Sequence, residues 1–68
     1  MSKADEMFEK LNYIILDYEP FLEYWNKEES KDIIFYKNKT LMIDADGITM
    51  EELKVINEKC KELGWLDE

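Results

Sequence analysis

The chain has 68 residues, of which 17 are acidic and 9 are basic, so its formal net charge is -8 at pH 7. It has no His for general-base catalysis or metal ligation, and its single cysteine (Cys60) excludes an intrachain disulfide. All its basic residues are Lys, so it lacks the Arg guanidinium group that reads the edges of nucleic-acid bases. A hydrophobic content of 46% is too high for a disordered acidic tail, and the length predicts one domain over 1–68.

The first residues have the spacing of a short helix. Apolar side chains recur at intervals that place them on one stripe of a helix: Ala4, Met7, Phe8 and Leu11. Ser2 is the predicted N-cap, and Asn12 is the predicted end of this helix.

Two segments rich in β-branched and aromatic residues come next. Residues 13–18 predict a strand, which Glu19 and Pro20 interrupt because Pro has no N–H to donate to a ladder. Residues 21–27 fit either a strand or a helix, and their aromatic content favours a strand. Residues 26–31 predict a polar turn.

A hairpin is predicted in the middle of the chain. Residues 32–37 and 40–44 carry apolar residues in strand-like patterns, and the short polar segment between them predicts a turn. Asn38 is the residue expected to take a positive φ there.

The last segment predicts a helix with both ends specified. Thr49 and Glu52 have the spacing of a capping box, and Gly64 lies where a left-handed C′ residue is expected. The predicted core stripe of this helix consists of Leu53, Ile56, Cys60 and Leu63, with Cys60 acting as a small core residue. The predicted fold class is therefore α+β: a helix, a three- or four-stranded antiparallel sheet, and a helix.

Catalytic and metal-binding patterns are weak. The run from Asp44 to Gly47 resembles part of a calcium loop, but Met42 and Leu53 would then stand where oxygen ligands are required. Paired carboxylates are frequent in any chain this acidic and do not by themselves indicate an acid–base pair. We expect no enzyme activity, no cofactor and no metal.

An aromatic and acidic stretch is the predicted protein-binding surface. Trp and Tyr are enriched at binding hot spots, and the surrounding carboxylates favour a basic protein partner. The residues selected on this basis are Tyr18, Phe21, Glu23, Tyr24, Trp25 and Glu28. Acidity disfavours direct nucleic-acid binding, and no segment has the length for a membrane span. The alternatives are a homodimer or larger homo-oligomer completed by paired hairpin edges or C-terminal helices and, less favoured, an acidic mimic of nucleic acid.

The C-terminal segment also resembles a known group. The run from Ile48 to Leu53, followed by Glu62-Leu63-Gly64-Trp65, resembles the closing helix of small acidic proteins encoded by phages and prophages of Gram-positive bacteria. The resemblance implies a small accessory protein that acts on a host or defence protein in the bacterial cytoplasm. Because no molecular activity is assigned to the group, it implies no functional residues.

Overall fold

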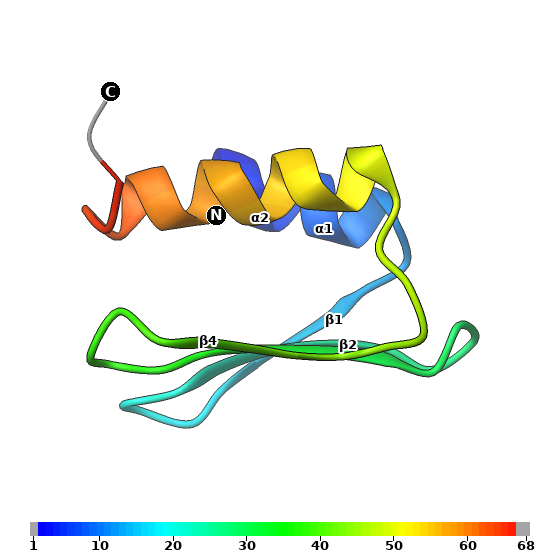
Figure 1. The fold of residues 1–68 in the computed structure, drawn as a ribbon, viewed down its shortest axis with the longest axis horizontal. Coiled ribbons are helices and arrows are strands. Elements are labelled where there is room, and N and C mark those ends of the chain that lie inside the picture. The colour runs from blue at the N-terminus through cyan, green and yellow to red at the C-terminus, as the bar shows by residue number, and fades with distance from the viewer. Residues whose placement is uncertain (1, 67–68) are drawn as a thin grey trace.

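The structure is a computed structural model that describes residues 2–66. Two helices pack on one face of a four-stranded sheet (Figure 1). The elements follow in the order α1 (Lys3–Lys10), β1 (Ile14–Asp17), β2 (Leu22–Asn26), β3 (Lys31–Phe35), β4 (Leu41–Asp44) and α2 (Met50–Glu62). The α+β class is confirmed, with the larger of the two predicted strand numbers. The ambiguous segment 21–27 contains strand β2, as its aromatic content predicted.

The sheet is an antiparallel meander in which each strand pairs with its neighbour in sequence, in the order β1-β2-β3-β4. The β1–β2 turn contains a cis Glu19–Pro20 peptide. In the β3–β4 turn the left-handed residue is Lys39, with φ of 63°, so the prediction of Asn38 was wrong. The hydrogen bond from Tyr36 N to Thr40 O, 2.7 Å long, closes a three-residue loop whose last residue takes the left-handed position.

The core lies between the helix layer and the inner face of the sheet. Four large side chains are almost completely buried there: Phe8, Tyr24, Ile33 and Phe35. The ring of Phe8 from α1 stacks on that of Tyr24 from β2, with centroids 4.1 Å apart, and Phe35 meets Tyr24 edge-on at 5.4 Å. Aromatic packing therefore joins α1 to the two central strands.

Both helices have the predicted caps. Ser2 Oγ accepts from Asp5 N, and Thr49 and Glu52 form the reciprocal capping box. At the end of α2, Gly64 has φ of +75°, Gly64 N donates to Lys61 O, and Trp65 N donates to Cys60 O. These two hydrogen bonds complete the Schellman motif.

The predicted core stripe of α2 was wrong in part. Ile56 and Cys60 are buried and Leu63 is partly buried against the core, but Leu53 is 49% exposed and Val55 takes its place. Glu52 and Lys59 are also buried. The stripe is rotated because α2 packs against α1 as well as the sheet, and because two of its inward positions hold ion-paired side chains.

Candidate protein-binding face of the sheet

The sheet has an inner face under the helices and an outer face with no helix over it (Figure 1). Because successive side chains in a strand point to opposite faces, the register separates the two sets. The inner face includes Tyr24, Ile33 and Phe35. We define the outer face by eight residues: Ile14, Leu16, Glu23, Trp25, Asp32, Ile34, Met42 and Asp44.

Five of these outer-face side chains are apolar. Ile14 is 52% exposed, Trp25 37% and Met42 44%, while Leu16 and Ile34 are partly buried beside them. In the register, Ile14 lies opposite Trp25, and Ile34 lies opposite Met42. The apolar residues therefore cross all four strands of the outer face.

The remaining three outer-face side chains are all carboxylates, and they lie on adjacent strands. Asp32 of β3 is directly opposite Asp44 of β4, and Glu23 of β2 is a diagonal neighbour of Asp32. A hydrogen bond with Asp32, with smaller effects from burial and from the charge of Asp32, raises the pKa of Glu23. Asp32 Oδ1 is buried and has no hydrogen-bond partner within the described residues. Like charges opposite each other destabilise a sheet, so this arrangement does not serve stability.

An aromatic pair continues the surface toward the β1–β2 and β3–β4 turns. Phe21 precedes β2 and Tyr36 follows β3, and their rings meet edge-on with centroids 4.9 Å apart. Both rings line a hollow of about 340 Å³ together with Lys37, Asn38 and Thr40. Tyr18, which is 56% exposed, donates its backbone N–H to Phe21 O and so lies at the same end of the sheet.

The fold keeps four of the six predicted binding residues on or beside the outer face. Glu23 and Trp25 lie on the outer face, with Tyr18 and Phe21 at its end, whereas Glu28 lies in the β2–β3 turn. Tyr24 cannot contact a partner because it is fully buried, so its selection was wrong. The outer-face residues of β1, β3 and β4 were not among the predicted binding residues. Their period-two alternation was readable, but which face the helices would cover was not.

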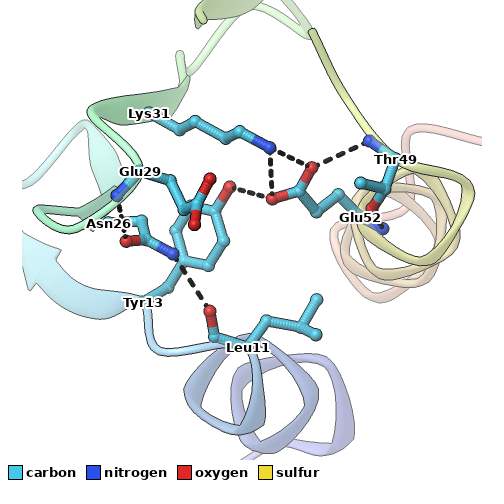
Figure 2. Close-up of polar contacts among 7 residues, drawn as sticks. All are labelled: Leu11, Tyr13, Asn26, Glu29, Lys31, Thr49 and Glu52. Atoms are coloured by element: carbon cyan, nitrogen blue, oxygen red, sulfur yellow. Dashed lines mark hydrogen bonds and ion pairs between the residues drawn. The ribbon is translucent and has the colours of Figure 1, made fainter.

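A buried carboxylate elsewhere in the molecule is fully engaged in structural contacts (Figure 2). Glu52 accepts hydrogen bonds from Lys31 Nζ at 2.8 and 3.1 Å, from Thr49 N at 2.8 Å and from the Tyr13 hydroxyl at 2.9 Å. Burial alone would raise the pKa of Glu52, but these donors together hold it below its ordinary value. Burial and the hydrogen bond to Glu52 raise the pKa of Tyr13. The cluster fixes the start of α2 to β3 and to the residue before β1.

Asn26 extends this structural region toward the β2–β3 turn (Figure 2). Its side-chain N–H donates to Leu11 O at 3.1 Å, and its side-chain oxygen accepts from Glu29 N at 3.0 Å. One buried amide therefore ties the turn to the end of α1.

A second polar cluster joins the two helices. Lys59 of α2 lies 3.2 Å from Asp5 of α1 and 3.5 Å from Glu62, and the Tyr24 hydroxyl donates to Asp5 at 2.7 Å. Glu62 also accepts from Ala4 N at 2.9 Å. Burial raises the pKa of the Cys60 thiol, next to Lys59 in sequence, and Cys60 is buried as predicted. These ionisable groups hold α1, α2 and β2 together.

Within residues 2–66, no group of three or more Asp, Glu or Cys side chains is arranged to hold a metal ion. Neither described helix has the length and apolarity needed to cross a bilayer. Comparison with protein-family models, with curated proteins and with solved structures finds no match for this chain.

Proposed function

We propose that the protein is a non-enzymatic interaction module whose outer sheet face binds a basic protein surface. The observation that carries the proposal is the outer face itself, which has five apolar residues, three carboxylates and no basic residue. A partner with apolar side chains and one or more Lys or Arg residues would cover the five apolar residues of the outer face and neutralise its three carboxylates.

The cost of the carboxylates to the free protein supports this proposal. A hydrogen bond with Asp32 and, to a smaller extent, burial and the charge of Asp32 raise the pKa of Glu23, and within the described residues Asp32 Oδ1 has no hydrogen-bond partner. A cationic side chain from a partner would supply a donor to Asp32 and offset the unfavourable pairing of Asp32 opposite Asp44. A second copy on this face would instead bring two sets of carboxylates together.

The proposed setting is the cytoplasm of a bacterial host, where the protein would act on a host or defence protein as a phage or prophage accessory factor. This part of the proposal depends on the resemblance of the C-terminal helix described above. Nucleic-acid mimicry is less favoured, because exposed carboxylates occur on α1, in the turns and on α2 as well as on the outer face.

The experiment is a comparative capture from bacterial lysate, read by mass spectrometry. The wild-type chain is compared with a Glu23→Lys/Asp32→Lys variant at about 50 and about 500 mM salt, because screening weakens exposed charge pairs. We expect one basic protein that the wild type retains at low salt and the variant loses.

The matched control carries the same change in charge on α1. Glu6→Lys/Glu9→Lys alters two exposed carboxylates in the helix layer, away from the outer face. It should retain the same protein as the wild type. Equal retention by the outer-face variant, or no retained protein for the wild type, contradicts the proposal.

A further inference from the structure

Strand β4 forms one edge of the sheet, with β3 on one side and no described strand on the other. The hydrogen bond from Tyr36 N to Thr40 O sets the alternation of the β3–β4 ladder. By that alternation Met42 and Asp44 direct their backbone groups toward β3, whereas Leu41 and Ile43 direct theirs toward the open edge. The edge therefore presents two residues whose N–H and C=O groups can pair with another strand.

This edge is apolar on both faces of the sheet. Met42 on the outer face is 44% exposed, and Ile43 on the inner face is 41% exposed although it lies on the same side as the helices. The other edge differs, because Ile15 of β1 packs against the core and the second residue with open backbone groups is Asp17. A strand added beside β4 would cover apolar surface on both faces.

The charges that flank β4 are opposite at its two ends. Lys37 and Lys39 lie in the turn before the strand, and Asp44 and Asp46 lie at and after its end. None of these four side chains forms an ion pair within residues 2–66. An antiparallel copy of the same strand would place the basic end of each β4 beside the acidic end of the other, which no parallel arrangement does.

We propose that two copies of the chain pair through β4 about a two-fold axis at Met42, which joins two four-stranded sheets into one of eight strands. In this register Met42 faces Met42, Leu41 faces Ile43, and Thr40 faces Asp44, so no like charges are directly opposed. In the same register Lys39 of each copy faces Ala45 of the other, between Asp44 and Asp46. The outer faces stay uncovered and become continuous, so dimerisation and partner binding are compatible and separately testable.

The register is tested by cross-linking through Met42→Cys in a Cys60→Ala background. Opposed residues of a non-hydrogen-bonded antiparallel pair have Cα atoms about 4.5 Å apart, within the range of about 4.4 to 6.8 Å that a disulfide spans. We expect mild oxidation to give a covalent dimer. Ile14→Cys in the same background is the control, because it is exposed on the other edge strand and should stay monomeric. Equal cross-linking of both variants, or none for Met42→Cys, overturns the register.

The oligomeric state is tested by light scattering from about 10 μM to about 1 mM. An interface made by one pair of short edge strands is small, so we expect the dimer to dissociate within that concentration range. We expect the mass to rise from 8.2 kDa toward twice that value. Ile43→Lys should raise the dissociation constant about tenfold or more, because inward-pointing charge protects an edge strand from pairing. Ile14→Lys should not. A wild-type chain that remains at 8.2 kDa throughout overturns the proposal.

A charge swap distinguishes a variant that has lost strand pairing from one that has lost its fold. Lys39→Glu should weaken the dimer, and adding Asp44→Lys to it should restore the dimer because the two charges exchange places. Lys27→Glu makes the same change in net charge in the β2–β3 turn and should leave the dimer unaffected. Failure of the second change to restore dimerisation, with circular dichroism showing a folded chain, rules out the antiparallel contact.

Discussion

At the scale of single residues, the surroundings of each carboxylate decide whether it stabilises the fold. Glu52 is buried but receives hydrogen bonds from Lys31, Thr49 and Tyr13. Glu23 is more accessible but neighbours Asp32, which raises its pKa. Glu52 therefore stabilises the fold, whereas the charged form of Glu23 is disfavoured in the free protein and would be stabilised by a cation from a partner. The sequence predicted the capping-box role of Glu52 but not its contacts with Lys31 and Tyr13, and it did not place Glu23 beside Asp32.

The lowered pKa of Glu52 gives a prediction about acid. Its unfolded-state pKa is near 4.5, and its folded-state pKa is lower, so the unfolded chain binds the proton more tightly. The stabilisation from Glu52 is therefore complete above that pH and is lost as the pH falls through the folded-state value. Glu62, whose pKa is also lowered, contributes with the same sign.

We expect Glu52→Gln to reduce the free energy of unfolding by about 2 kcal/mol at pH 7, because Lys31 loses a charged acceptor. The variant should also show a shallower loss of stability below pH 4.5 than the wild type. Urea unfolding at a series of pH values measures both effects. An unchanged slope with pH would show that Glu52 is not among the groups responsible.

At the scale of elements, the helices are defined mainly by their ends. The capping box at Thr49 and the Schellman motif at Gly64 were both readable from the sequence, because each depends on residues within one turn. The buried stripe of α2 was not, because the rotation of a helix depends on the elements packed around it. Val55 and Lys59 face inward for that reason.

Two glycines provide a matched test of the helix end. Gly64 has φ of +75°, where an L side chain is strained, whereas Gly47 has no such φ and no atom within 4 Å of an added Cβ. We expect Gly64→Ala to lower the free energy of unfolding by about 1 kcal/mol. Gly47→Ala should leave it unchanged or raise it by about 0.5 kcal/mol. Equal effects in thermal unfolding would argue against a conformational requirement at Gly64.

At the scale of the whole molecule, the two polar clusters and the aromatic core lie on one side of the sheet. Lys59 joins α1 to α2, and Glu52 joins α2 to β3, so both helices are fixed to the inner face. The outer face is left to solvent with its apolar strip and carboxylates. This division separates the residues that maintain the fold from those that the proposed partner would contact.

Substitutions at two adjacent residues of β2 should affect stability and partner binding differently, because the two side chains lie on opposite faces of the sheet. Tyr24 is fully buried, and Trp25 is 37% exposed on the opposite face. We expect Tyr24→Ala to destabilise the protein by about 3 to 5 kcal/mol and Trp25→Ala by less than about 1.5 kcal/mol. Trp25→Ala should nevertheless abolish partner retention in the capture experiment. A large loss of stability from Trp25→Ala would instead make it a structural residue.

The sequence by itself determined the elements and the caps, because helix ends, strand periodicity and the interruption at Pro20 depend on nearby residues. It also favoured strand over helix for residues 21–27. Only the tertiary structure decided which face of each strand the helices would cover, and this placed Tyr24 in the core and Trp25 outside it. The strand register likewise decided that Glu23, Asp32 and Asp44 would meet on one face. These are properties of contacts between distant segments, which local patterns do not encode.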